Sequence, residues 1–171
     1  TVCQGVLYSQ HGFNVLANTV GTITRTNHLQ TTKGCDSTLN LSLVVHPIFS
    51  DTTNTTLCEA THYSWQPTGY IHNANGTYLP SSHTYNYDTL SDGNYIFRDT
   101  TLTTQYGCKN NHTLFLKINP IYDTTIHDTV CQGTLYNRYG LNFTAQTSGI
   151  YSHTLTSVYG CDSIIKINLT V

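Results

Sequence analysis

The chain contains no methionine, a single tryptophan and a single glutamate among its 171 residues. Charged side chains are also scarce, since seven lysines and arginines stand against nine acidic residues and give a net charge of −2. So few basic residues exclude the positively charged surface with which proteins bind nucleic acid. No apolar run reaches the roughly 18 residues that a membrane-spanning helix needs. The sequence therefore predicts neither a nucleic-acid partner nor a membrane span.

The short motifs that carry well-known chemistries are absent as well. The sequence has no Gly-x-Ser-x-Gly, phosphate-binding loop, His-Glu-x-x-His or dinucleotide fingerprint. It has no Cys-x-x-Cys pair, and its nine histidines follow no recurring spacing, which argues against a zinc site. Serine, histidine and aspartate are all present, so a triad assembled only by the fold stays open as an alternative. We predict no enzyme, no cofactor and no metal site.

Threonine, by contrast, is abundant, with 31 residues, and 13 tyrosines accompany it. Both residue types favour β-strands, so the composition predicts an all-β protein. Six cysteines in such a chain indicate an oxidising, extracellular setting.

The cysteines divide the chain into three copies of one repeat. In each copy a tyrosine follows the first cysteine by five residues, and a glycine precedes the second cysteine. The first cysteines with their tyrosines are Cys3 and Tyr8, Cys58 and Tyr63, and Cys131 and Tyr136; the second cysteines are Cys35, Cys108 and Cys161. The word TVCQG at residues 1–5 recurs at 129–133 for this reason. We predict repeats at residues 1–47, 48–120 and 121–171.

The segment after each second cysteine alternates apolar and polar residues, as in Leu39, Leu41, Leu43 and Val45. Strict alternation predicts a strand with one face on a core. Clusters of glycine, asparagine and aspartate separate the other short strands of each copy as hairpins. Each repeat is therefore predicted to be a small immunoglobulin-like β-sandwich.

A repeat of about 55 residues has a small hydrophobic core that stabilises it only marginally. A covalent cross-link is therefore expected in each repeat. Six cysteines allow many pairings, but the repetition favours one disulfide inside each repeat. The predicted pairs are Cys3–Cys35, Cys58–Cys108 and Cys131–Cys161.

The sequence motifs around these cysteines resemble the cysteine-containing immunoglobulin-like repeats of large secreted and cell-surface proteins of Bacteroidetes. The pattern there is similar to T-I-C-x-G-x-x-Y, then G-x-Y, then G-C-D-S and an alternating strand. The third copy has TVCQGTLY, SGIY and GCDSIIKINLTV, and the first has TVCQGVLY and GCDSTLNLSLVV. The second copy departs with CEATHY and GCKN but keeps the spacing of cysteine and tyrosine. The resemblance implies extracellular modules of adhesins and surface fibres, and it implies no ligand or catalytic residue.

The second copy also contains an insertion at about residues 64–92, because Cys58 and Cys108 lie 50 residues apart against 32 and 30 in the other copies. The insertion is rich in aromatic residues, namely Trp65, Tyr70, Tyr78, Tyr85 and Tyr87. Aromatic faces with polar rims bind sugar rings or other proteins. Three alternatives stay open: packing on its own domain, a protein contact and a glycan site.

Seven of the eight aspartates are followed by serine or threonine. This pattern resembles the O-glycosylation motif of secreted Bacteroidetes proteins, and the resemblance implies covalent glycans. The candidates are Thr52, Thr100, Thr124 and Thr129, followed by Thr89, Ser37 and Ser163. The alternative is structural, because Asp-Ser and Asp-Thr pairs form turns at strand ends.

We predict a non-catalytic array of extracellular modules at the cell surface, forming part of a fibre, stalk or adhesin. The rival interpretation is a carbohydrate-binding surface protein that uses the insertion. Lead-in segments, PIFSDTTNT and PIYDTTIHD, precede the second and third copies, and the first copy has none. We therefore expect either a longer array or a head-to-tail homo-oligomer in which a neighbour supplies the missing strand. The expected partners are glycans or proteins.

Overall fold

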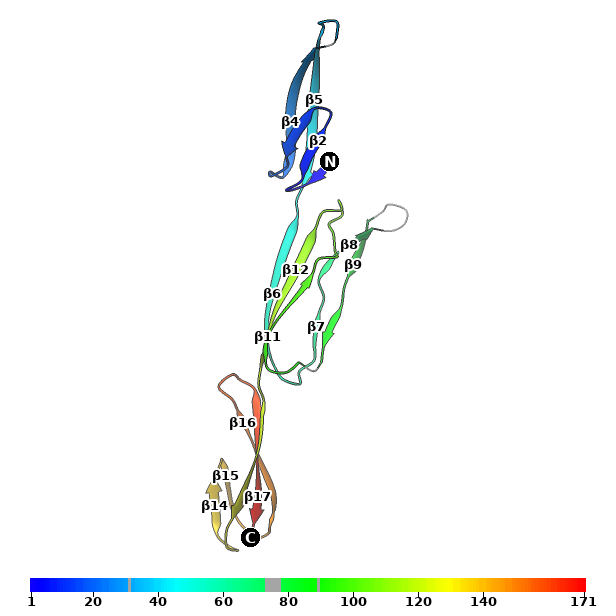
Figure 1. Ribbon diagram of the computed structural model, residues 1–171. Helices are drawn as coiled ribbons and strands as arrows, with labels where there is room; N and C mark the ends of the chain where they lie inside the picture. Colours follow the sequence, from blue (N-terminus) through cyan, green and yellow to red (C-terminus); the bar gives the residue numbers. More distant parts are fainter. Residues whose placement is uncertain (31, 73–77, 89) are drawn as a thin grey trace. The chain divides into compact units, whose positions relative to one another are not determined.

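The computed structural model describes residues 1–30, 32–72, 78–88 and 90–171, without the side chains of residues 71, 72 and 78 (Figure 1). Every regular element within these ranges is a β-strand, so the all-β prediction is confirmed. The abundance of threonine and tyrosine accounts for this, since both pack well on a pleated, half-buried surface. No helix long and apolar enough to cross a membrane occurs in the described ranges.

The first predicted repeat contains a three-stranded sheet, ordered β1-β5-β4, and a β2–β3 hairpin. The strands are β1 (Val2–Cys3), β2 (Leu7–Gln10), β3 (Phe13–Leu16), β4 (Gly21–Gln30) and β5 (Asp36–His46). Their core consists of Phe13, Val15, Ala17, Leu43 and Val45. The alternating pattern predicted from the sequence thus places Leu43 and Val45 on the buried face of β5.

The third predicted repeat has the same arrangement, with a sheet ordered β13-β17-β16 and a β14–β15 hairpin. The strands are β13 (Tyr122–Thr129), β14 (Leu135–Arg138), β15 (Leu141–Thr144), β16 (Gly149–Thr156) and β17 (Asp162–Thr170). The core consists of Tyr136, Ala145, Ile167 and Leu169. Sheet plus hairpin fits a β-sandwich in both segments, while the number of immunoglobulin-like repeats stays a prediction.

The middle segment repeats this plan around an inserted hairpin. Its elements are β6 (Phe49–Cys58), β7 (Tyr63–Trp65), β8 (Thr68–His72), β9 (Tyr78–Ser82), β10 (Tyr85–Tyr87), β11 (Gly93–Asp99) and β12 (Asn110–Asn119). The sheets are β11-β12-β6, β10-β7 and β8-β9. The predicted insertion therefore consists mainly of the β8–β9 hairpin, which lies between β7 and β10 in the chain.

The lead-in segments form strands. β13 pairs in parallel with β17 over eight residues, whereas β1 pairs with β5 over two. The repeated tyrosines fasten these lead-ins: the Tyr136 hydroxyl donates to Asp128 Oδ2 at 3.0 Å, and Tyr63 and Thr55 hydroxyls lie 3.2 Å apart. The five-residue spacing between cysteine and tyrosine thus places a hydroxyl against the strand that precedes the cysteine.

The chain divides into two compact units. Unit 1 comprises Thr1–Asn54, Ser64–Asn86 and Ile96–Phe115, and unit 2 comprises Thr55–Tyr63, Tyr87–Tyr95 and Leu116–Val171. The division passes through the middle segment rather than through the linkers at residues 47 and 120. Each unit consequently contains one complete junction between two predicted repeats. The predicted boundaries at 47 and 120 stay predictions.

The predicted disulfide inside each repeat is wrong. Cys3 is bonded to Cys108, and Cys58 is bonded to Cys161. The predicted pairs Cys3–Cys35, Cys58–Cys108 and Cys131–Cys161 are therefore all replaced. Each observed bridge joins cysteines of two neighbouring predicted repeats, and both cysteines of a bridge belong to the same compact unit.

Strand length explains the error. Cys3 pairs in register with His46 at the end of β5, whereas Cys35 directly precedes the first residue of β5. Eleven residues of strand place these two cysteines about 35 Å apart at ~3.4 Å per residue. A disulfide needs Cα atoms within about 7 Å, and the Cys3–Cys108 bridge has 5.5 Å. The two cysteines of one repeat thus lie at opposite ends of the same strand.

Candidate functional site: the junctions between repeats

The first junction lies between residues 1–47 and 48–120, and its centre is the Cys3–Cys108 bridge. Two main-chain hydrogen bonds flank the linker Pro47. The N–H of Gln4 donates to His46 O at 2.8 Å, and the N–H of Phe49 donates to Lys109 O at 3.0 Å. The linker is therefore held on both of its sides, and the disulfide adds a covalent connection beside it.

Ring stacking strengthens the same junction. The rings of His46 and Tyr106 lie parallel, with centroids 3.8 Å apart and an angle of 11° between their planes. His46 is the last residue of β5 in the first predicted repeat, and Tyr106 stands two residues before Cys108. The turn that supplies the cysteine thus also supplies an aromatic contact to the preceding repeat.

The second junction has the same design with different side chains. Its bridge is Cys58–Cys161, and the N–H of Glu59 donates to Asn119 O at 3.0 Å, as Gln4 does to His46. The Tyr159 ring, two residues before Cys161, lies beneath the Lys117 ammonium group at 5.6 Å from the ring centroid. A tyrosine two residues before the cysteine therefore marks both junction turns.

Glu59, the only glutamate, has a role that no sequence pattern indicated. Its Oε2 accepts the N–H of Ile121 at 3.0 Å, and its Oε1 accepts the N–H of Asp92 at 2.9 Å. Ile121 directly follows the linker Pro120. One carboxylate thereby connects the start of the third repeat to the residue after Cys58 and to the loop before β11.

Two recurring turns present the junction cysteines. The residue two positions after the first cysteine has positive φ in every copy: +82° at Gly5, +60° at Ala60 and +79° at Gly133. In the second turn Cys108 and Cys161 each donate their N–H to a hydroxyl four residues earlier, Thr104 and Ser157, at 3.2 Å. Gly107 and Gly160, with φ of +77° and +79°, complete it.

The second turn has a recognisable sequence, [Ser/Thr]-x-Tyr-Gly-Cys. Only glycine adopts its left-handed position without strain. The turn places cysteine and tyrosine side by side at the start of a strand. The hydrogen bonds that hold the turn are made within its own five residues.

A surface cavity of about 560 Å³ opens beside the first junction. Its lining includes Pro47, Phe49, Tyr70, Tyr106, Asn110 and His112. The Nε2 atom of His112 is buried and has no hydrogen-bond partner among the described residues. Tyr70 belongs to the insertion, so an aromatic residue of the insertion faces this cavity.

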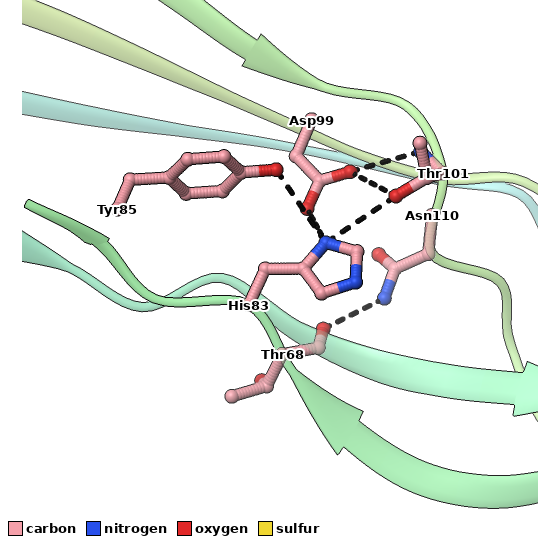
Figure 2. A network of polar contacts seen from close by, with 6 residues as sticks. All are labelled: Thr68, His83, Tyr85, Asp99, Thr101 and Asn110. Atoms are coloured by element: carbon pink, nitrogen blue, oxygen red, sulfur yellow. Dashed lines mark hydrogen bonds and ion pairs between the residues drawn. The ribbon is translucent and has the colours of Figure 1, made fainter.

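A polar network around the buried Asp99 of β11, which is 1% exposed, connects β11 to the insertion (Figure 2). His83 Nδ1 lies 2.6 Å from Asp99 Oδ2, and the Thr101 hydroxyl donates to Asp99 Oδ1 at 2.7 Å. Burial raises the pKa of Asp99, but the hydrogen bonds from the hydroxyl and N–H of Thr101 and from His83 together hold that pKa below its ordinary value. The same carboxylate, after burial, contributes to raising the pKa of Tyr85.

This network does not have the geometry of a hydrolytic triad. A triad needs the nucleophilic hydroxyl on one imidazole nitrogen and the carboxylate on the other. Here the Thr101 hydroxyl and the Asp99 carboxylate both lie at Nδ1 of His83 (Figure 2). Beside the network the side chain of Asn110, the first residue of β12, donates to Thr68 O at 3.0 Å and so connects the insertion to that strand.

The aromatic residues of the insertion fall into different environments. Trp65 is 6% exposed and packs against Tyr85, with ring centroids 5.5 Å apart. Tyr70, Tyr85 and Tyr87 are half-buried. The side chain of Tyr78 lies outside the described residues. Trp65 thus contributes to the core of its segment and offers no open face to a ligand.

The glycosylation candidates are mostly accessible. Thr52, Thr100, Thr124, Thr129 and Ser37 are exposed, and Thr89 lies outside the described residues. The hydroxyl oxygen of Ser163 is buried, so a glycan could not be attached there without local opening. Asp51 and Asp128 accept the N–H of the following threonine at 2.8 and 2.9 Å. Both aspartates lie within strands, β6 and β13, and the contact reaches the next residue, whereas an Asx turn would reach the second residue on. Both explanations of the motif stay open.

In the described ranges no group of three or more metal-binding side chains occurs. The chain matches no known protein-family model and no curated protein. The junction geometry is therefore the main basis for a functional argument.

Proposed function

We propose that the chain is a non-catalytic, tension-bearing array of extracellular modules, part of a cell-surface fibre, stalk or adhesin. The observation that supports this is the position of the disulfides, which connect each predicted repeat to the next instead of closing each repeat on itself. A bridge inside a domain stabilises that domain. A bridge across a junction limits how far two neighbouring domains can be pulled apart.

The covalent connectivity makes this limit quantitative. The shortest covalent route from Thr1 to Val171 enters the Cys3–Cys108 bridge, returns along the chain to Cys58 and leaves through Cys161. This route crosses about 62 residues, or about 220 Å when fully extended, against about 600 Å for the chain without bridges. The disulfide-bonded chain therefore cannot be extended beyond about a third of the contour length of the chain with reduced disulfides.

Single-molecule force spectroscopy tests the proposal. The chain is held by its termini and pulled before and after reduction. We expect complete extension near 220 Å when oxidised and near 600 Å when reduced, with higher unfolding forces in the oxidised state. Equal unfolding forces in both states would show that the bridges carry no load and would contradict the proposal.

A carbohydrate-binding function is the second candidate, and the cavity beside the first junction is the observation that favours it. Tyr70 and Tyr106 supply aromatic surface there, with Asn110 and His112 as polar neighbours, a combination typical of sugar sites. The test is glycan binding by the Tyr70→Ala variant, which keeps the main-chain hydrogen bonds between Tyr70 and Thr103. Loss of binding with unchanged thermal stability would support this function, and no binding by the unchanged chain to a broad glycan panel would exclude it.

A further inference from the structure

Both disulfides follow one rule: the first cysteine of a predicted repeat is bonded to the second cysteine of the next. Cys3 belongs to residues 1–47 and Cys108 to 48–120, while Cys58 belongs to 48–120 and Cys161 to 121–171. The sequence separations are nearly equal, at 105 and 103 residues. The rule leaves one first cysteine to be assigned, Cys131.

Cys131 lies in the same local structure as its bonded counterpart Cys3. The carbonyl of Cys131 accepts the N–H of Thr134 at 3.1 Å, as that of Cys3 accepts Val6 at 3.2 Å. The N–H groups of Gly133 and Gly5 make matching bonds, to Ala145 at 2.7 Å and to Ala17 at 2.8 Å. The Cys131 thiol is free and exposed, whereas Cys3 and Cys58 are half-buried at their junctions.

Cys131 also stands at the matching end of its sheet. The N–H of Val130 donates to Thr170 O at 3.0 Å, so Cys131 lies beside the end of β17, as Cys3 lies beside the end of β5. At the first junction the bonding partner approaches from this end. The exposed thiol of Cys131 thus has the same position and the same surrounding turn as Cys3, without a bonded partner.

We propose that Cys131 is a covalent coupling site, which forms a disulfide with the cysteine of a Tyr-Gly-Cys turn in a further repeat of this kind. The required features of the partner follow from the turns that carry Cys108 and Cys161 at the two complete junctions. It needs a thiol that follows a left-handed glycine, and a tyrosine two residues before the cysteine to pack on the preceding repeat, as Tyr106 and Tyr159 do. This inference rests on the proposed function in that it requires further repeats to be coupled.

The bond can form by thiol–disulfide exchange with a small-molecule disulfide such as oxidised glutathione. The Cys131 thiolate attacks one sulfur of that disulfide, forms a mixed disulfide and releases one thiolate. The thiolate of the incoming Tyr-Gly-Cys turn then attacks the Cys131 sulfur and releases the second thiolate. Two protein thiols are oxidised, and one small disulfide is reduced to two thiols.

The test uses the full chain extended by a second copy of residues 46–171 placed directly after Val171, which continues the array in phase. After oxidative refolding with glutathione, non-reducing peptide mapping should show Cys131 bonded to the appended counterpart of Cys108. The matched control is Cys131→Ser in the same extended chain, in which that appended cysteine should stay reactive toward a thiol reagent. If Cys131 remains a thiol, or bonds elsewhere, while both original bridges are intact, the proposal is overturned.

Peptide mapping of native material identifies the source of the partner. A Cys131 peptide joined to a Tyr-Gly-Cys peptide from outside this sequence identifies a further repeat as the partner. A Cys131 peptide joined to the Cys35 peptide contradicts the proposed partner, because Lys33 stands two residues before Cys35 in place of the tyrosine. A Cys131 peptide recovered as a thiol from native material contradicts the proposal. The force measurement on residues 1–171 does not involve Cys131, so the two proposals can fail separately.

Discussion

Tyr106 stacks on His46 across the first junction, with the two rings 3.8 Å apart and nearly parallel. The contact joins the last residue of β5 to the turn that carries Cys108. Aromatic pairs of this kind contribute about 0.5–1.5 kcal/mol beyond the area they bury. The stack is therefore expected to stabilise the junction independently of the disulfide.

We predict that Tyr106→Ala destabilises unit 1 by about 1 kcal/mol and that the loss disappears when His46 is already alanine. A double-mutant cycle by urea denaturation measures this coupling. Tyr139→Ala is a suitable control, because Tyr139 is an exposed tyrosine at a hairpin turn. Additive effects of the two junction substitutions would contradict the stacking argument.

Ala60 occupies a backbone position that the other two copies fill with glycine, and its φ is +60°. A left-handed conformation costs a residue with a Cβ atom about 1–2 kcal/mol, while the greater freedom of glycine in the unfolded chain offsets part of the gain. We therefore predict that Ala60→Gly stabilises the protein by about 1 kcal/mol. Chemical denaturation measures this change, and Gly5→Ala should shift stability in the opposite direction. A destabilising Ala60→Gly would show that the turn is not strained.

The two bridges close loops of 105 and 103 residues. In the chain-entropy model a loop of this size stabilises the folded state by about 4–5 kcal/mol. We predict a loss of this order when Cys3 and Cys108 are both replaced by serine. Cys131→Ser should change stability by less than about 0.5 kcal/mol, because its thiol is exposed and free. Thermal and urea unfolding of the two variants give the comparison.

The lowered pKa of Asp99 makes the insertion sensitive to acid. A carboxyl group whose pKa is lower in the folded state contributes stability above its unfolded pKa, near 3.8, and that stability is lost as pH falls through the folded pKa. Thr101→Val removes the hydroxyl that donates to Asp99 and should raise this pKa. NMR titration of the Asp99 carboxyl tests the shift, and acid unfolding of Thr101→Val should begin at higher pH. An unchanged titration would contradict the role of Thr101.

The strands could be predicted from the sequence because alternation along Leu39–Val45 records directly which face is buried. The disulfides could not be predicted from repetition alone, because repetition does not distinguish a bond within a repeat from one between neighbours. The length of the strand that follows each Gly-Cys motif determines which cysteines can come within bonding distance. The eleven-residue strand from Asp36 to His46 separates the cysteines of the first repeat far beyond bonding distance.

Glu59 was not recognised for a related reason. Its partners are main-chain N–H groups, and such contacts leave no residue pattern in the sequence. Tyr106 and Tyr159 did leave one, in the Tyr-Gly-Cys words, although Lys33 replaces the tyrosine in the first copy. The Tyr-Gly-Cys motif occurs twice, and each occurrence lies at one of the two junctions in this chain.

The Glu59 carboxylate is expected to stabilise the second junction. It accepts two main-chain N–H groups, and hydrogen bonds to a charged acceptor contribute about 1.5–3 kcal/mol each when buried. Glu59 is half-buried, so we predict a loss of about 2 kcal/mol for Glu59→Ala and a smaller loss for Glu59→Gln, which keeps one acceptor oxygen. Asp92→Ala is the matched control, because it retains the N–H that donates to Glu59 and removes only an exposed side chain. Urea denaturation gives the free energies, and hydrogen exchange at the N–H of Ile121 should accelerate in Glu59→Ala alone. Equal exchange rates at Ile121 in Glu59→Ala and Asp92→Ala would show that the carboxylate does not hold the linker.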